Sequence, residues 1–246
     1  MSSKSVYIHN ESVHNNDAAT EIVPLIMDMY KPSSILDVGC GLGNWLKLFS
    51  DFGVTDYLGI DGSYLDKKKL KIPLANNLDV DLCQPFDLKR KFDLLICLEV
   101  AEHLPESVAD DFINSIVKHS DHIIFSAAIP YQGGQNHLNE QWPDYWMKKF
   151  KRHGYTFQDT IRCKIWDNPK VEWWYKQNIF FVTKDEFKSE YHFGSLIHPE
   201  NYIGKMKNHE QFLNHLNSGK LGLWFSIKLI AKNFIYMVKS IVSKNN

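Results

Sequence analysis

The stretch ILDVGCGLGNWLKLF, from Ile35 to Phe49, decides the fold. Three apolar residues and one acidic residue lead into Gly39, Gly41 and Gly43, after which apolar positions recur at helical spacing. This order predicts a buried strand, a glycine-rich turn and the start of a helix. Because glycine lacks a Cβ and tolerates positive φ, a ligand can approach bare backbone there, facing the free N–H groups of the helix start. We therefore expect a ligand at this turn.

Apolar runs alternate with helical patterns along the rest of the chain. Further strands are expected at 57–60, 77–82, 92–98, 122–128, 155–159 and 179–183. Helices are expected at 17–30, 44–51, 106–120 and 142–153. Strands separated by such helices predict an α/β fold, with a Rossmann-like, mostly parallel seven-stranded sheet and helices on both faces. Ligands of such sheets bind at the carboxyl ends of the strands.

The composition is typical of a globular protein in a reducing compartment. A chain of 246 residues with 44% apolar content can form one α/β domain with additions. Its four cysteines have no C-x-x-C spacing, so we expect neither a disulfide framework nor a structural zinc site. The amino terminus is polar and has no apolar segment of a secretory signal, so a cytoplasmic location is expected.

Three segments are expected: a leader or lid over 1–18, the ligand-binding domain over 19–185, and a carboxyl-terminal extension over 186–246. Within the leader, either the side chains fold over the cleft as a lid or the segment is a polar tail. The lid candidates are Tyr7, His9, His14 and Asn15.

An amphipathic helix is expected at about 221–244. Its apolar side comprises Leu223, Ile227, Ile230, Ala231, Phe234, Val238 and Ile241. Lys228, Lys232 and Lys239 lie opposite, which makes the segment a poor membrane span. With Trp224 and Phe225 near its start, it suits a helix on the anionic inner face of a membrane. Packing on its own domain or in a homodimer is the alternative.

Charge is distributed unevenly along the chain. Residues 201–246 contain seven lysines and one glutamate, a net charge of +6, which leaves −7 for residues 1–200. A net negative charge over residues 1–200 does not provide the basic surface typical of nucleic-acid-binding proteins, and no DNA partner is expected.

Acidic residues stand at the ends of three neighbouring strands. Asp37 lies inside the first, and Asp61 ends the second, where a carboxylate can accept both hydroxyls of a ribose. Asp81 and Leu82 close the third, where an acceptor and an apolar side chain suit a purine. Together the strand ends predict an adenosine pocket. A nicotinamide dinucleotide is the rival ligand, although such sites usually space the third glycine one residue further on.

Over roughly residues 20–185, this pattern resembles the class I S-adenosylmethionine-dependent methyltransferases. The resemblance implies that Asp37 and the glycines hold the methionine end of S-adenosylmethionine, Asp61 the ribose, and Asp81 with Leu82 the adenine. The full set of implied cofactor residues is Asp37, Gly39, Cys40, Gly41, Gly43, Asn44, Asp61, Gly62, Asp81, Leu82 and Leu98.

The segment LEVAEHLPE follows the fourth strand and carries candidate catalytic groups. Glu99, Glu102 and His103 stand at i, i+3 and i+4, so a helical turn beginning here would point all three the same way. His137 lies in a glycine-rich loop after the fifth strand. Two carboxylates and imidazoles form either a hard-metal site or a supported general base.

The E-x-x-E-H pattern with a later histidine is similar to the divalent-metal-dependent O-methyltransferases, such as those of ubiquinone biosynthesis and the small-RNA 2′-O-methyltransferases. The resemblance implies Glu99, Glu102, His103 and His137 as ligands of Mg²⁺ or another divalent cation, which would lower the pKa of the acceptor hydroxyl. Glu102, His103 and His137 would then be the catalytic residues. Without a metal, Glu99 would lie near the cofactor, and His103 or His137 would be the general base.

The loop SAAIPYQGGQNHLNEQWPDYW and the later VEWWYKQN resemble bacterial methyltransferases of surface-polysaccharide and glycan gene clusters. This resemblance implies a role in polysaccharide biosynthesis. Several aromatic residues could then offer flat faces to a sugar ring, or could simply fill the core. These residues are Trp142, Trp146, Trp173, Trp174 and Tyr175.

We therefore expect an S-adenosylmethionine-dependent O-methyltransferase acting on a hydroxyl of a sugar or glycan precursor. An RNA 2′-O-methyltransferase would fit the metal motif but not the acidic body. A catalytically inactive, cofactor-binding interaction protein is the alternative outside enzymes.

Overall fold

The computed structural model describes residues 17–185, 195–218, 220 and 222–244. The chain divides into two compact units, one extending to His198 and the other beginning at Pro199. Residues 195–198 belong with the first unit: the His198 backbone N–H donates to Gln177 Oε1 (3.0 Å). The four lid candidates lie outside the described residues.

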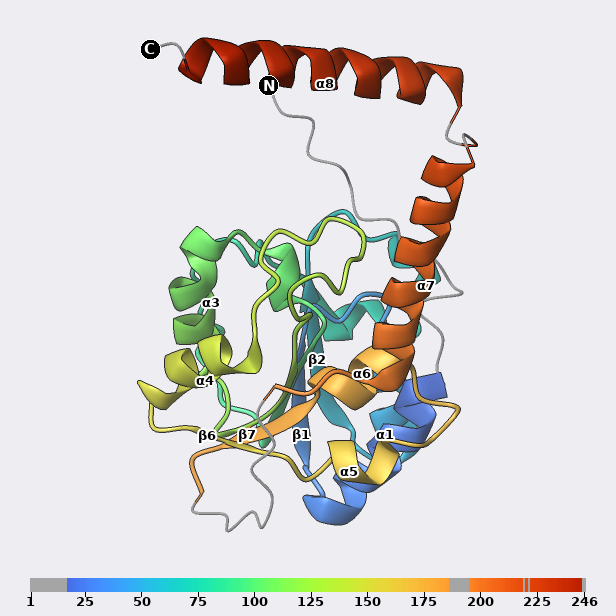
Figure 1. Ribbon diagram of the computed structural model, residues 1–246. Coiled ribbons are helices and arrows are strands. Elements are labelled where there is room, and N and C mark those ends of the chain that lie inside the picture. The colour runs from blue at the N-terminus through green and yellow to red at the C-terminus, as the bar shows by residue number, and fades with distance from the viewer. Residues whose placement is uncertain (1–16, 186–194, 219, 221, 245–246) are drawn as a thin grey trace. The chain divides into compact units, whose positions relative to one another are not determined.

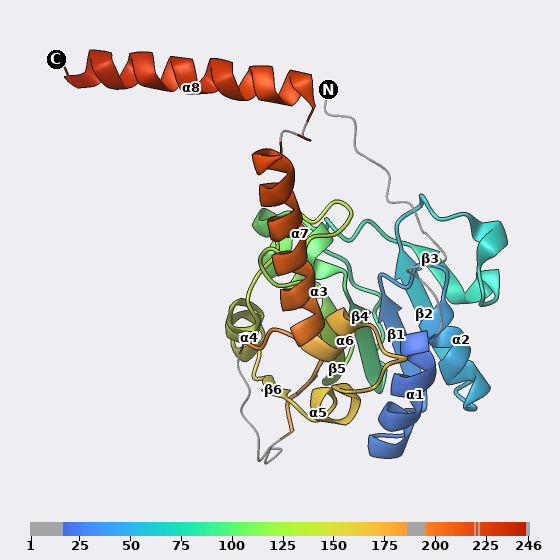
Figure 2. The ribbon, with the colours of Figure 1, turned by 45° about the vertical axis from the view of Figure 1, so that its right-hand side comes forward.

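A seven-stranded sheet forms the centre of the first unit (Figures 1 and 2). Its strands are β1 (Ser34–Val38), β2 (Asp56–Asp61), β3 (Asn77–Asp79), β4 (Leu94–Leu98), β5 (His122–Ser126), β6 (Thr156–Gln158) and β7 (Phe180–Thr183). They lie in the order β3-β2-β1-β4-β5-β7-β6. Neighbours pair in parallel except β7, which is antiparallel to both β5 and β6. The expected mostly parallel sheet is confirmed.

Helices cover both faces of this sheet (Figure 1). They are α1 (Asp17–Met29), α2 (Asn44–Asp51), α3 (Ala109–Ile116), α4 (Pro143–Lys151), α5 (Arg162–Ile165) and α6 (Trp173–Asn178). Buried side chains of α1, α2 and α5 form one core cluster with the sheet. Those of α3 and α4 form a second cluster. The sheet is therefore the middle of three layers, as doubly covered parallel strands require.

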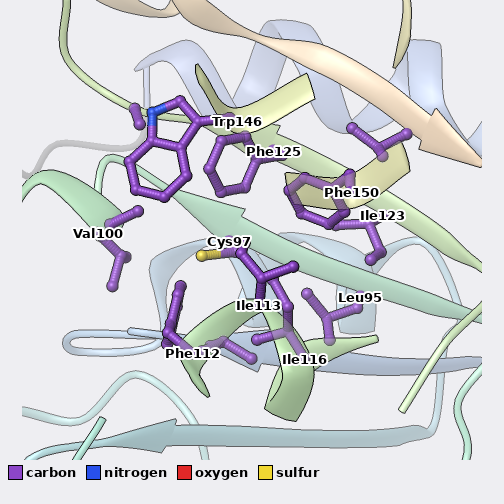
Figure 3. Close-up of a cluster of buried hydrophobic side chains, with 14 of the residues drawn as sticks. Leu95, Cys97, Val100, Phe112, Ile113, Ile116, Ile123, Phe125, Trp146 and Phe150 are labelled. Carbon is purple, nitrogen blue, oxygen red and sulfur yellow. The ribbon is translucent and has the colours of Figure 1, made fainter. Parts of the chain in front are cut away.

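The apolar runs of the strands feed both clusters because successive side chains point to opposite faces. In β4, Leu95 and Cys97 face α3 and α4, whereas Leu94 and Ile96 face α1 and α2. Figure 3 shows the cluster that contains α3 and α4, in which Phe125 packs between Trp146 and Phe150 with ring centroids 5.5 and 5.2 Å away. This alternation explains why β4 is apolar at every position.

The structure differs from the sequence prediction in the third strand, in the helix expected over 106–120 and in two short helices that were not predicted. The third strand ends at Asp79 instead of residue 82, because the Asp81 side chain accepts the Cys83 backbone N–H (3.0 Å) and turns the chain. The helix expected over 106–120 is a 3₁₀ turn, η4 (Glu106–Val108), followed by α3, which ends at Ile116. The helices α5 and α6 were not predicted, since four and six residues are too few for a periodic pattern.

The second unit contains two helices, α7 (Pro199–Asn217) and α8 (Leu223–Lys244). The expected carboxyl-terminal helix is confirmed as α8. The helix α7 was not predicted, because its large apolar residues are few and are spread over about half of the helix circumference. No helix in the described ranges is long and apolar enough to cross a membrane.

Candidate active site

The glycine turn after β1 and the turn after β4 touch each other at the carboxyl edge of the sheet. Gly39 has a φ of 79°, and a Cβ there would lie 2.3 Å from Val100 Cγ2. Only glycine fits both the conformation and the space. Strand order reverses between β1 and β4, which is where ligands of open α/β sheets bind. The two predicted sites are therefore adjacent.

Asp37 lies buried beneath this edge. It is 4% exposed, and burial, followed by the charge of Asp61, holds the pKa of its carboxyl group well above the usual range. Among the described residues, none donates a hydrogen bond to its Oδ2 atom. A donor supplied by a ligand, such as the ammonium group of S-adenosylmethionine, would satisfy this atom.

Asp61 ends β2 and organises the glycine turn. Its Oδ2 accepts the Gly41 backbone N–H (2.8 Å), and its Oδ1 accepts the Gly62 backbone N–H and the Tyr64 hydroxyl (2.6 Å each). A carboxylate offers about four acceptor positions, so three are already used. The Tyr64 hydroxyl therefore occupies a position on Asp61 at which a ribose hydroxyl could bind.

The other predicted cofactor residues surround the same edge. Cys40 is buried, and its Sγ atom accepts a hydrogen bond from Asn77 Nδ2 (3.4 Å). Gly43 precedes α2 with a φ of 83°, and Asn44 is the first residue of that helix. Leu82 is buried, while Asp81 is exposed with its Oδ1 atom engaged in the turn. Leu98 ends β4.

Three of the four predicted metal ligands converge. Glu102, His103 and His137 each bring one ligand atom within 4.8 Å of the others, and they form the group of this kind found among the described residues. The first two lie in the 3₁₀ turn η3 (Ala101–His103), and His137 lies in the loop after β5. The two imidazole rings meet edge to face, with centroids 4.8 Å apart. One carboxylate and two imidazoles suit a divalent cation.

Glu102 is fully buried and holds the two segments of the site together. Its Oε1 atom accepts the Ala128 backbone N–H (3.2 Å), and its backbone carbonyl accepts those of Leu138 (2.8 Å) and Asn139 (3.0 Å). None of the described residues donates to its Oε2 atom. Burial, then the nearby charge of Glu99, raises the pKa of the Glu102 carboxyl group, and a side-chain hydrogen bond with Glu99 adds to the shift. A cation would give the unsatisfied oxygen a partner, so the donor set fits a metal.

Glu99 does not belong to this group, which corrects the expectation of a continuous helical turn. Its φ is 53°, so the chain makes a left-handed step after β4, and η3 begins only at Ala101. The Glu99 carboxylate instead accepts hydrogen bonds from Gln132 Nε2 (3.0 Å) and Asn178 Nδ2 (3.2 Å). These two amides, which the sequence reasoning missed, fix Glu99 beside the cluster.

Glu140 was also missed, and it supports His137. Its Oε1 atom lies 2.9 Å from His137 Nδ1 and accepts the Gly133 backbone N–H (2.6 Å), while Oε2 accepts that of Tyr131 (2.8 Å). The only signal in the sequence is the H-x-x-E spacing, which is weak within a loop.

Gly134 makes room for the His137 ring. A Cβ on Gly134 would lie 2.2 Å from Nε2 and 2.4 Å from Cε1 of His137. Together with a distance of 2.8 Å to Cδ2, these distances place Gly134 over the face of the ring, so the glycine itself does not block the in-plane lone pair of Nε2.

The five aromatic candidates for sugar binding differ in how deeply they are buried. Trp146 is 2% exposed and belongs to the core, as Figure 3 shows. Trp173, Trp174 and Tyr175 are half-buried on α6, and Tyr175 packs against Trp45 with ring centroids 5.6 Å apart. Trp142, at 39% exposed, is the most exposed of the five, and it lies at the end of the His137 loop.

Comparisons with known proteins identify the class. A family profile described as a methyltransferase domain matches residues 14–168, more than half of the chain. The chain therefore belongs to this methyltransferase family. A search among proteins of curated function found no match.

Solved structures share the fold at low identity. The magnesium protoporphyrin IX methyltransferase of Synechocystis PCC 6803 with bound SAH is 18% identical, with a TM-score of 0.53, covering 74% of this chain and 90% of that one. The sugar N-methyltransferase KedS8 of Streptoalloteichus sp ATCC 53650 is 14% identical, with a TM-score of 0.54, covering 76% and 98%. CalS10 of Micromonospora echinaspora, an amino pentose methyltransferase, is 14% identical, with a TM-score of 0.52, covering 74% and 99%. Family and fold together define a class I S-adenosylmethionine-dependent methyltransferase.

Proposed function

We propose that this methyltransferase transfers the methyl group to a hydroxyl of a sugar or glycan precursor, assisted by a divalent cation. The observation that carries the proposal is the convergence of Glu102, His103 and His137 beside the glycine turn. The unsatisfied, buried Oε2 atom of Glu102 supports a cation as their common partner.

Each residue has a defined task in this proposal. Glu102, His103 and His137 would hold the cation, which when bound lowers the pKa of an acceptor hydroxyl and orients its oxygen. Glu140 orients His137 by accepting a hydrogen bond from its Nδ1 atom. The β1 turn and Asp61 would position the cofactor, whose sulfonium methyl is the electrophile. The acceptor oxygen forms a bond to that methyl as the carbon–sulfur bond breaks, so the site acts chiefly by alignment and by removing the acceptor proton.

The acceptor class rests on the rim of the site. Tyr131, Leu138 and Trp142 are 88%, 63% and 39% exposed on the loop that carries His137. Exposed rings with one polar edge suit the mixed faces of a sugar. The sugar methyltransferases KedS8 and CalS10 have the same fold, which supports the idea that this fold can accommodate such acceptors.

The test is a methyl-transfer assay with purified full-length protein, labelled S-adenosylmethionine and a panel of nucleotide-linked sugars and oligosaccharides. Mass spectrometry should find a methyl ether on a sugar, and EDTA should abolish the product until Mg²⁺ or Mn²⁺ is restored. A short RNA panel is the matched alternative acceptor. Methylation of RNA alone, or of a sugar amine alone, would contradict the proposal.

A second candidate is metal-free general-base catalysis by His137, favoured by its hydrogen bond to Glu140. In that case Nε2 would take the acceptor proton, while the carboxylate would stabilise the resulting imidazolium. Full turnover in EDTA together with inactivity of His137→Ala would establish this mechanism.

A further inference from the structure

The helix α8 presents large apolar side chains to solvent. Leu223, Ile230 and Phe234 are 77%, 69% and 63% exposed, and every large apolar side chain described between 223 and 237 is at least 39% exposed. Exposed apolar surface of this extent marks an interaction site.

Most of these side chains form a broad arc on one side of the helix, whereas Phe225, Leu229 and Tyr236 lie on the other side. At 3.6 residues per turn, Leu223, Ile227, Ile230, Phe234 and Met237 fall on one face, and Trp224 and Ile235 extend that face to one side. Lys228 and Lys232 lie between this arc and the three apolar side chains on the other side. The helix is therefore apolar and basic at once.

The arc is too wide for the seam of a coiled coil. Two paired helices bury only a narrow stripe, and charged residues on both sides of it choose the partner. In α8 the positions beside the apolar row include Trp224, Ala231 and Ile235, which are uncharged. No acidic residue occurs anywhere in residues 211–246. A second copy of this helix would therefore meet lysines without a carboxylate to pair with them.

A lipid surface fits both properties. An interfacial helix buries a wide apolar face in the headgroup boundary and directs its lysines toward anionic phosphates. Spanning the bilayer would instead bring Lys232, near the middle of the helix, into hydrocarbon, which is costly for a charged ammonium. The absence of a span among the described helices agrees with a helix that lies flat.

We propose that α8, the long red helix in Figure 2, binds the surface of a membrane containing anionic lipid, and so places the enzyme at that surface. This inference rests on α8 alone and does not depend on the acceptor or the metal.

Vesicle flotation of the full-length protein tests it. The protein should float with phosphatidylcholine–phosphatidylglycerol vesicles at low salt, and about tenfold less with pure phosphatidylcholine or at high salt. Two paired variants, Lys228→Glu/Lys232→Glu and Ile230→Glu/Phe234→Glu, should each reduce binding about tenfold or more.

The matched control is Lys148→Glu/Lys151→Glu, which makes the same charge change at exposed positions of α4 and should float like wild type. Melting temperatures of both α8 variants should equal that of wild type, because the substituted side chains are exposed.

Three results would overturn the inference. The wild-type protein could remain unbound with anionic vesicles at low salt, or the α4 control could lose as much binding as the lysine variant. Light scattering could also find a dimer that Ile230→Glu/Phe234→Glu dissociates while no vesicle binding occurs, which would assign the face to a second copy.

Discussion

The imidazole of His137 and the carboxylate of Glu140 are joined by a hydrogen bond of 2.9 Å between Nδ1 and Oε1. A carboxylate can only accept, so the hydrogen lies on Nδ1 and the lone pair of the ring lies on Nε2. The pair thus selects the tautomer that can either bind a cation or take a proton through Nε2.

Glu140→Gln tests this selection. The amide retains one acceptor oxygen but no charge, so we expect methyl transfer and Mn²⁺ affinity to fall by about 10- to 100-fold. Titration of Mn²⁺ by electron paramagnetic resonance measures the affinity independently of turnover. Glu106→Gln, at an exposed carboxylate of η4, is the control and should change neither quantity. Unchanged Mn²⁺ affinity in Glu140→Gln would show that the hydrogen bond between His137 and Glu140 stabilises the loop conformation but does not affect cation binding.

Glu102→Gln separates stability from chemistry. The variant keeps an acceptor for the Ala128 backbone N–H and removes a carboxyl group whose pKa burial raises, so the free energy of unfolding should not fall. Cation binding should disappear, and activity should fall by about 100-fold or more. Urea unfolding, Mn²⁺ titration and the transfer assay measure the three quantities. An active variant would exclude Glu102 as a ligand.

Tyr64→Phe removes the hydroxyl that now occupies Asp61 Oδ1. If a ribose hydroxyl takes that position, affinity for S-adenosylhomocysteine should rise by about two- to tenfold, since no protein hydrogen bond has to be broken first. Asp61→Asn should weaken binding instead. Calorimetric titration measures both variants, and a loss of affinity in Tyr64→Phe would mean that the hydroxyl contacts the ligand.

Gly59→Ala should destabilise the first unit. A Cβ there would lie 2.6 Å from Cys40 Sγ, so β2 or the glycine turn would have to move, at a cost of about 1–3 kcal/mol. The double variant with Cys40→Ala removes the sulfur and should recover part of the loss. Urea unfolding of the two single variants and the double variant gives the coupling energy, which should be favourable. Strictly additive losses would contradict the contact.

The buried His119 should make stability pH-dependent. Its Nε2 atom accepts the Leu88 backbone N–H (2.9 Å), so Nδ1 donates to the Ser115 carbonyl (2.7 Å) and the ring is neutral. Burial lowers its pKa, although the carbonyl and Asp87 oppose the shift. As pH falls below about 6.5, His119 is therefore protonated in the unfolded chain before it is protonated in the folded protein. The free energy of unfolding decreases from that pH down to the pKa of His119 in the folded protein. The decrease should be less than about 1.4 kcal/mol per pH unit.

Urea unfolding between pH 7.5 and 5 measures this slope. His119→Gln does not titrate, so its stability should be lower at pH 7.5 but should fall less steeply with acidification. Equal slopes for the variant and the wild type would place the pH dependence elsewhere.

The strands were predictable from the sequence because burial on both faces leaves a simple signal. Leu94 to Leu98 must be apolar throughout, and the structure confirms the strand. The antiparallel placement of β7 beside β5 could not be read from its own four residues, since it depends on the path of the chain through α5 and α6.

The convergence of three candidate residues was predictable from their types, but the geometry around them was not. The spacing of Glu102 and His103 and the later His137 carried enough information to group them. The position of Glu99 did not follow, because a left-handed step at one residue leaves no mark in the sequence when that residue is not glycine. Gln132, Asn178 and Glu140 were missed because partners brought together by tertiary structure have no fixed spacing.

The double hydrogen bond of the Glu102 carbonyl to Leu138 and Asn139 has a consequence for protein engineering. It anchors the end of the His137 loop to the segment that carries the other two members of the cluster. Tyr131, Gln135 and Leu138 project exposed side chains from this anchored loop. Substitution libraries at these three positions should therefore change the choice of acceptor while Glu102, His103 and His137 keep their positions. The loop is thus a suitable segment for changing acceptor specificity.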